Sequence, residues 1–152
     1  MLRTTRETDT GIYGFFGKYR PLSNFDITPF THDGLVYKSA EHAFHCAKTL
    51  DKDWFTLIFN AATPSEAKKL GRQCPLRSDW NDVRFDIMRS ITFSKFVNSP
   101  ALRKLLLSTE DKYLEETNDW GDSFWGFDLQ KGGKNYLGHI LMSVRNELRI
   151  LK

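Results

Sequence analysis

The sequence predicts an α+β fold that is predominantly helical, and three observations lead to this prediction. Short strand-like runs separated by glycine, proline and asparagine gather near the N-terminus. Helical periodicity dominates the rest of the chain. The 152 residues are 40% hydrophobic and contain no repeat or linker, which suits one domain with its own core. We therefore expect a flexible N-terminus at residues 1–11 and a single compact domain over residues 12–152.

Composition narrows the classes of partner. A net charge of +3 tolerates an anionic ligand but falls short of the clustered charge of a dedicated DNA-binding surface. The aromatic share of 14% can fill a core or line a pocket that stacks on flat ligands. Two cysteines, no apolar signal segment and no membrane-spanning run together predict a reduced, cytoplasmic protein without a membrane partner.

The first third of the chain predicts short strands at residues 12–16, 25–28 and 35–37, with a hairpin turn at residues 32–34. Between the first two strands lies the segment Gly17–Asn24, GKYRPLSN. Its lysine, tyrosine, arginine and asparagine are typical of a loop that contacts phosphates or bases, and an ordinary turn is the alternative.

The next stretch, Tyr37–Lys48, predicts a helix capped by Ser39. Because residues three, four and seven apart share a helix face, Glu41, His45 and Lys48 fall within one arc. An acid, a titratable ring and a cation are then displayed together. The alternative is a solvated face with an unimportant Glu41–His45 pair.

Helical periods or capping signals follow at residues 51–62, 64–70, 78–98, 100–109 and 137–151. The first of these is apolar at Trp54, Leu57 and Ile58, which predicts a buried helix. Thr63, the proline after it and a glutamate three residues on form a capping box for the second. Residues 112–117 suit a strand or an extended connection.

The segment Asn118–Asn135 fits no helix or strand period, and its aromatic residues argue against disorder. We expect a functional loop, in which carboxylates lie among indole and phenyl rings. Such a carboxylate can act as an acid or a base, and the rings can stack on a base or sugar. Asp122 is the candidate, with turn chemistry beside Gly121 as the alternative. The run from Lys131 to Lys134 is a plausible anion cradle.

A zinc site or a Cys–His nucleophile is the rival reading of His42, His45, Cys46 and Cys74. The spacing does not match a paired CxxC or an HExxH motif, and no carboxylate orients a Cys–His pair. We therefore do not expect a metal site.

Five motifs, in order, resemble the NADAR superfamily, the YbiA-like N-glycosidases. They are GFFGKYRPLSNF, YKSAEHAFHCAK, the Gly71-Arg72 pair, Trp80 with the helix that follows it, and DSFWGFDLQKGGKNYLGHILMSVR. The resemblance covers residues 13–148. It implies a small, largely helical YbiA-like domain without metal or cofactor. It also implies hydrolysis of an N-glycosidic bond at a ribose phosphate. Family members act either on phosphoribosylamino-pyrimidine intermediates of riboflavin synthesis or on ADP-ribose linked to guanine in nucleic acid.

Carried over by motif, the resemblance implies two catalytic carboxylates, Glu41 and Asp122. The implied and inferred substrate-binding residues are Asn24, Lys48, Arg72, Trp80, Trp125, Gly126 and Asn135. The spacer FDLQKGG departs most from the bacterial pattern, which leaves the role of Asp128 open. For Trp80 the packing interpretation is the stronger one, because this residue begins an apolar stripe.

Chemistry suggests how these roles divide. Breaking a ribosyl C–N bond builds positive charge on the sugar, so a carboxylate near the anomeric carbon is needed. Glu41 lies in a first helical turn, where the helix dipole favours its ionised form, and we expect it to be this anion. Asp122 would be the general acid or a positioning group, and Lys48 and Arg72 would neutralise phosphate.

A non-catalytic module that only binds ADP-ribose or nucleic acid is the remaining alternative. Two carboxylates argue against it, because binding an anion gains nothing from them. The expected partner is a substrate containing ribose phosphate or ADP-ribose, free or carried on nucleic acid. The basic balance favours ADP-ribosyl-guanine slightly over a phosphoribosylamino-pyrimidine.

Overall fold

The structure of the protein is a computed structural model that describes residues 1–151. It is a mixed α+β fold, predominantly helical, as the sequence predicts. The chain forms two compact units. The first unit combines Met1–Ser23 with the chain from Pro100 onward, and the second is the continuous segment Asn24–Ser99. Within residues 1–151, no helix has the length and apolar character needed to cross a bilayer.

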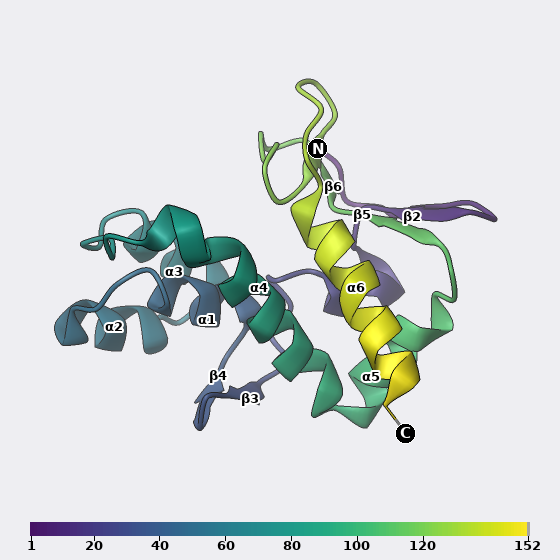
Figure 1. The fold of residues 1–152 in the computed structure, drawn as a ribbon. Helices are drawn as coiled ribbons and strands as arrows, with labels where there is room; N and C mark the ends of the chain where they lie inside the picture. Colours follow the sequence, from purple (N-terminus) through teal and green to yellow (C-terminus); the bar gives the residue numbers. More distant parts are fainter. Residues whose placement is uncertain (152) are drawn as a thin grey trace. The chain divides into compact units, whose positions relative to one another are not determined.

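The second unit contains one hairpin and four helices (Figure 1). The hairpin strands are β3, Phe30–His32, and β4, Leu35–Tyr37, which pair antiparallel with Phe30 opposite Tyr37. The helices are α1, Ala40–Cys46, α2, Lys52–Phe59, α3, Pro64–Gly71, and α4, Trp80–Val97. Asp33 and Gly34 both have positive φ, which is the requirement of a tight hairpin turn. The turn is therefore where it was predicted, whereas the strand expected at residues 25–28 does not form.

Side-chain caps begin three of these helices. Ser39 Oγ accepts a hydrogen bond from the backbone N–H of His42, and Asp51 caps α2 in the same way. Thr63 Oγ1 accepts from the N–H of Glu66, whose carboxylate accepts in turn from the N–H of Ala62. These caps satisfy donors that a helix N-terminus otherwise leaves without partners. They explain why the starts of α1, α2 and α3 follow the sequence signals closely.

Two predictions about burial in this unit are wrong. The helix α2 buries Ile58, but Leu57 is 53% exposed and Trp54 is only half-buried, so α2 is a surface helix with a narrow apolar stripe. On α4 the spacing of Trp80, Val83, Ile87 and Ile91 predicts one buried stripe, but Val83 and Ile87 are only half-buried. The fully buried positions of α4 are Met88, Ile91, Thr92, Lys95 and Phe96. The buried face shifts because the C-terminal half of α4 packs against β3, where His32 Nδ1 lies 2.8 Å from Ser94 Oγ.

The first unit is built on a small sheet of order β1-β2-β5. Its strands are β1, Arg6–Glu7, β2, Gly11–Tyr13, and β5, Tyr113–Glu115. The strand β2 pairs antiparallel with β1 and parallel with β5. A second pair consists of β6, Thr117–Asn118, and β7, Phe127–Asp128, and is also parallel. The segment expected to be flexible, residues 1–11, thus contributes one strand and the start of another.

Helices complete the first unit. They are the 3₁₀ helix η1, Gly17–Leu22, with α5, Pro100–Ser108, and α6, Tyr136–Ile150. The predicted apolar stripe of the closing helix is confirmed, because Leu137, Ile140, Leu141, Val144 and Leu148 are all buried. The helix α6 packs against β5 and α5 (Figure 1). Most of the segment GKYRPLSN forms η1 rather than an open loop.

Candidate functional site

The helix α1 carries a charged face that is buried. All seven of its residues are buried, with Glu41 only 7% exposed and His45 only 4% exposed. The helix packs against α2, α3 and α4, so it has no broad solvent face. The alternative of a solvated Glu41–His45 pair is therefore wrong. Burying an acid and an imidazole costs free energy unless each has a hydrogen-bond partner. The contact between Glu41 and His45 offsets part of this cost.

The two side chains satisfy each other one helical turn apart. Nε2 of His45 lies 2.7 Å from Oε1 of Glu41. The backbone N–H of Glu41 donates to the carbonyl of Asn24, at 3.0 Å, which ties the first turn of α1 to the start of the unit. No described residue donates to Oε2 of Glu41. The carboxylate is thus oriented through Oε1 alone.

Burial lowers the pKa of His45, and the nearby cations Lys48 and Lys68 lower it further, while Glu41 opposes them. The imidazole is therefore neutral at neutral pH. Since Glu41 can only accept when ionised, a neutral ring must donate Nε2–H to it. The imidazole thus serves Glu41 as a neutral hydrogen-bond donor and not as a cation.

Lys48 interacts electrostatically with Glu41, Lys68 and Arg72, and we call Lys48, Lys68 and Arg72 the basic cluster. Burial lowers the pKa of Lys48, and the charges of Glu41, Arg72 and Lys68 all act on it. Its Nζ lies 5.7 Å from the ring centroid of Phe44. Arg72 is exposed and ends α3. Within residues 1–151, no carboxylate forms an ion pair with these three side chains, so their charge is available to an anionic ligand.

Trp80 and Asn24, which the sequence places in the substrate site, are engaged in packing. Trp80 is buried at the start of α4, and its ring centroid lies 5.1 Å from that of Phe44. Nδ2 of Asn24 donates to the sulfur of Met88 at 3.4 Å. These contacts support the packing interpretation of Trp80 and show that Asn24 positions Glu41 through its backbone.

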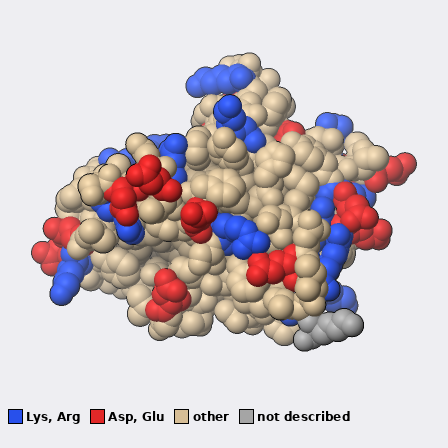
Figure 2. Space-filling model, in the orientation of Figure 1, with Lys and Arg blue, Asp and Glu red and all other residues tan. Residues whose placement is uncertain are grey.

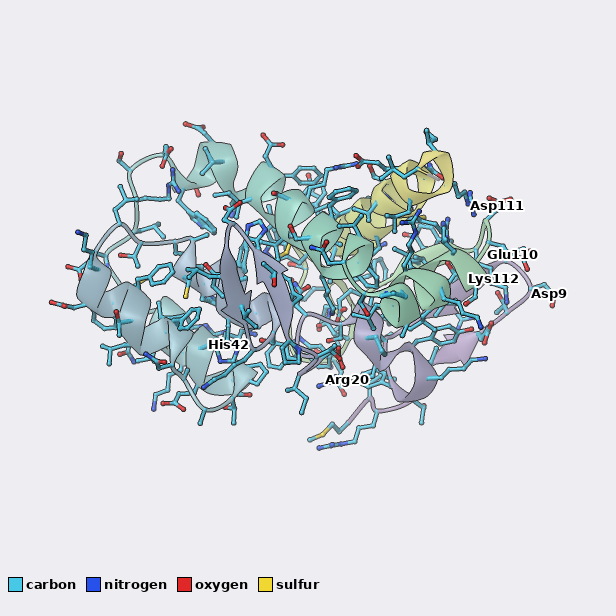
Figure 3. All side chains as sticks on the ribbon, turned by 90° about the horizontal axis from the view of Figure 1, so that it is seen from below. Asp9, Arg20, His42, Glu110, Asp111 and Lys112 are labelled. Carbon is cyan, nitrogen blue, oxygen red and sulfur yellow. The ribbon has the colours of Figure 1, made fainter. Side chains whose placement is uncertain are left out.

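The structure argues against a zinc site and against a thiol nucleophile, because the side chains considered for them have other partners or the wrong protonation state. Nδ1 of His42 lies 2.7 Å from Ser39 Oγ, and Nε2 lies 2.9 Å from the carbonyl of Ala61. His42 lies among the helices of the second unit (Figure 3). Burial raises the pKa of the Cys46 thiol to about 12, so a nucleophilic thiolate is disfavoured. Among the described residues, no group of three or more His, Cys, Asp or Glu side chains is arranged to hold a metal ion.

In the first unit, the carboxylate of Asp122 stabilises a turn, as the alternative interpretation of this residue predicts. Its Oδ1 accepts from the backbone N–H groups of Phe124, at 3.2 Å, and Trp125, at 3.0 Å. Asn118, which is fully buried, binds both the N–H and the carbonyl of Asp122. The carboxylate is therefore fixed in orientation by its own turn, and a role in chemistry remains a proposal.

Asp128 is the residue that organises this loop, and sequence reasoning left its role open. Its carboxylate accepts from the N–H groups of Gly121, Gln130 and Lys131 at 2.8, 3.0 and 2.9 Å. These backbone donors, that of Lys131 foremost, lower the pKa of Asp128. An aspartate followed by a glycine-rich run is a signal for such a turn, and it could have been used.

Asn135 and Gly126 serve the backbone as well. Asn135 is buried with a φ of 53°, and its amide binds Glu116 N, Leu114 O and Tyr113 OH. A Cβ on Gly126 would lie 2.5 Å from the carbonyl of Glu116, so only glycine fits there. Trp125 is half-buried and contacts Phe124 edge to face, with ring centroids 4.8 Å apart. Asn135 and Gly126 thus hold the backbone of this unit, and Trp125 packs on Phe124.

A buried, oriented anion beside several cations is the arrangement of an enzyme that binds an anionic substrate and stabilises positive charge developing on it. A comparison of the whole chain with known protein families agrees with this class. The model of the NADAR domain matches residues 8–149, and the chain belongs to this family.

Curated relatives carry the corresponding names. The chain is 34% identical over 149 residues to N-glycosidase YbiA of Escherichia coli K12, covering 97% of this chain and 92% of that protein. It is 39% identical over 144 residues to an N-glycosidase of Nostoc punctiforme, covering 91% of this chain and 92% of that protein. A riboflavin biosynthesis protein of Vibrio vulnificus is 35% identical over 130 residues, covering 84% of this chain but 35% of that protein.

The fold is similar to a solved structure. The NMR structure of E. coli YbiA matches with a TM-score of 0.84 at 34% sequence identity. The match covers 95% of this chain and 88% of the YbiA chain.

Proposed function

We propose that this NADAR-family hydrolase cleaves the N-glycosidic bond between a base and the ribose of a phosphate-bearing substrate. The observation that carries the proposal is the buried carboxylate of Glu41, which His45 holds through Oε1 and which interacts electrostatically with Lys48 of the basic cluster. The matched relatives named N-glycosidases support the reaction class.

Glu41 supplies the charge that the reaction needs. As the C–N bond breaks, the anomeric carbon becomes oxocarbenium-like, and an anion beside it lowers the barrier. Oε2 stabilises this charge or removes a proton from the attacking water. Water then supplies OH to the anomeric carbon, and the leaving base nitrogen gains a proton. Burial strengthens the interaction, because charge acts over a lower effective dielectric than in water.

The basic cluster binds the phosphate. Lys48 acts as a point charge, and Arg72 can hold two phosphate oxygens with its planar fork. Because burial lowers the pKa of Lys48, an incoming anion also stabilises its charged form. This division leaves Glu41 for the sugar and the cations for the phosphate.

Asp122 keeps a proposed role as general acid or positioning group. The backbone N–H groups of Phe124 and Trp125 hold its carboxylate in place. A catalytic group needs such a fixed orientation. The substitution Asp122→Asn retains an acceptor oxygen for these N–H groups but removes the acid. A large fall in kcat with unchanged folding would support the acid role. An unchanged kcat would show that Asp122 only stabilises its turn.

Two substrate classes share this chemistry. The relatives named for riboflavin biosynthesis favour a phosphoribosylamino-pyrimidine. The net charge of +3 favours ADP-ribosyl-guanine on nucleic acid, although acidic and basic side chains are interspersed on the face drawn in Figure 2. Interspersed charge limits how tightly a long nucleic acid binds there, so the modified base itself must supply recognition.

The test is direct incubation with both substrates. The protein is mixed with a phosphoribosylamino-pyrimidine or with an oligonucleotide carrying ADP-ribosylated guanine, and free base and free sugar are followed by chromatography and mass spectrometry. Release from either supports the proposal and names the substrate class. Binding to ADP-ribose without release from either substrate would instead support the non-catalytic module.

A further inference from the structure

His45 has a second nitrogen whose surroundings are unusual. Nδ1 is fully buried and has no hydrogen-bond partner among the described residues. It faces Gly71 at the end of α3, where a Cβ would lie 2.1 Å from Nδ1 and 2.6 Å from Cγ of the ring. The hydrogen that occupies the Cβ direction of Gly71 therefore points at Nδ1. Glycine is required here for the imidazole to fit at all.

This contact decides where the ring can carry its proton. A neutral imidazole has one N–H, at Nδ1 or at Nε2. A hydrogen on Nδ1 would meet the Cα–H of Gly71 and would have no acceptor. A hydrogen on Nε2 points at Oε1 of Glu41, 2.7 Å away. Both the steric and the hydrogen-bonding arguments select the Nε2–H tautomer.

The charges near the ring also disfavour the imidazolium, in which both ring nitrogens carry a proton. Lys48, which follows α1, and Lys68, on α3, oppose protonation, and Glu41 alone favours it. The imidazolium would also need space at Nδ1 that Gly71 occupies. The ring can therefore offer Glu41 one donor without becoming a cation that would cancel its charge.

We propose that His45 is a positioning residue, which Gly71 locks into the Nε2–H tautomer so that a single neutral donor aims the carboxylate of Glu41. This role rests on the proposed function, because it assigns His45 to the orientation of the catalytic anion. His45 itself does not touch the substrate. It keeps Oε1 occupied and Oε2 directed away, which reduces the reorganisation needed when positive charge appears.

The first experiment needs no turnover. Long-range ¹H–¹⁵N correlation spectra of the ¹⁵N-labelled imidazoles report which ring nitrogen carries hydrogen. We expect His45 to show protonated Nε2 and bare Nδ1 at pH 7.5. A protonated Nδ1 would overturn the proposal whether or not the protein is an N-glycosidase.

The second experiment uses a pair of variants. His45→Gln keeps an N–H donor within reach of Glu41, and we expect kcat to stay within about threefold of the wild type. His45→Leu removes the donor, and we expect kcat to fall at least about tenfold with little change in KM. In a plot of kcat against pH, the acidic limb of the His45→Leu variant should also move to higher pH. The reason is that the lost donor disfavours the ionised form of the Glu41 carboxylate.

The control is His42→Leu at the neighbouring buried histidine, whose nitrogens bind Ser39 and Ala61 instead of Glu41. It should lower stability without moving the acidic limb. If His45→Leu retains the wild-type kcat and pH limb, the positioning role is wrong. If the wild type releases no base from any substrate while the tautomer is Nε2–H, the proposed function fails but the locked ring stands.

Discussion

At the scale of single residues, the molecule separates groups that can act from groups that hold the backbone. Glu41 retains an oxygen without a described donor, whereas Asp128 and Asn135 spend their side chains on backbone partners. Side-chain carboxylates therefore have different uses in the two units, as Glu41 and Asp128 show. Hydrogen-bond partners, and not residue type, distinguish a candidate catalytic carboxylate from a structural one.

Replacing Glu41 with Gln tests the anion directly. The amide keeps the size of the side chain and an oxygen that can accept from Nε2 of His45. It removes the charge that stabilises the oxocarbenium-like state, so we expect kcat to fall by about 100-fold or more. The measurement is base release under substrate saturation, with circular dichroism as the folding control. Turnover close to the wild-type level would remove Glu41 from the mechanism.

Replacing Lys48 with Met tests the basic cluster. Methionine keeps much of the stem that lies near Phe44 but removes the charge. We expect KM for a phosphate-bearing substrate to rise about tenfold, with little change for the dephosphorylated analogue. Lys52→Met, an exposed position at the start of α2, is the matched control. Equal effects on both substrates would show that Lys48 does not contact the phosphate.

At the scale of elements, the stability of α1 depends on how its first turn is held. Ser39 Oγ accepts from the N–H of His42 and also bonds to the ring of the same residue. The start of α1 is thus tied to a histidine that reaches across to Ala61, beyond α2. The cap and the imidazole therefore stabilise the start of α1 together.

Ser39→Ala removes this cap inside the protein. We expect the free energy of unfolding to fall by about 2 kcal/mol or more, since the loss of a cap is joined by a buried imidazole nitrogen without its partner. Thr63→Ala, the exposed cap of α3, is the control and should cost about 1 kcal/mol. Urea denaturation at pH 7.5 measures both. A cost at Ser39 no larger than at Thr63 would contradict the coupling between cap and ring.

Local signals explain which elements could be predicted from the sequence. The caps at Ser39 and Thr63, the hairpin turn at Asp33 and the stripe of α6 are encoded within a few residues, and all are confirmed. Exposure of Leu57 and burial of Lys95 depend on which elements pack nearby, which periodicity does not encode. Lys95, on α4, has Asp26 as a partner, with 4.0 Å between Nζ and Oδ2.

The candidate site was predictable in its residue types but not in its contacts. The contact of Glu41 with His45 follows from helical spacing, but Lys48 lies beyond the last residue of α1, and spacing does not encode the burial of the pair. The use of Asn135 and Gly126 by the backbone was hidden, because their partners Leu114 and Glu116 lie far away in the sequence. The contact of Gly71 with His45 was hidden for the same reason.

At the scale of the whole molecule, buried histidines make stability depend on pH. Burial is the leading cause that lowers the pKa of both His42 and His45 in the folded protein. Below the unfolded value of about 6.5, the unfolded chain binds protons that the folded protein refuses. Stability must therefore fall as the pH drops from 6.5, until the folded pKa values are reached.

We expect the urea midpoint of unfolding to be constant from pH 7 to 8 and to decrease between pH 6.5 and 5. Each histidine contributes a slope of up to about 1.4 kcal/mol per pH unit. His45→Gln removes one of the two titrating groups and should reduce this slope. A midpoint that stays constant down to pH 5 would show that neither ring resists protonation.

The pairing of β2 with β5 bears on the order in which the protein is made. Residues 11–13 leave the ribosome early, but their parallel partners, residues 113–115, emerge only after all of Asn24–Ser99 has been synthesised. The continuous unit can thus fold while translation proceeds, and the first unit must wait for the final third of the chain. Until then β2 has only β1 to pair with, and its other edge, which β5 later covers, stays open to pairing with another chain.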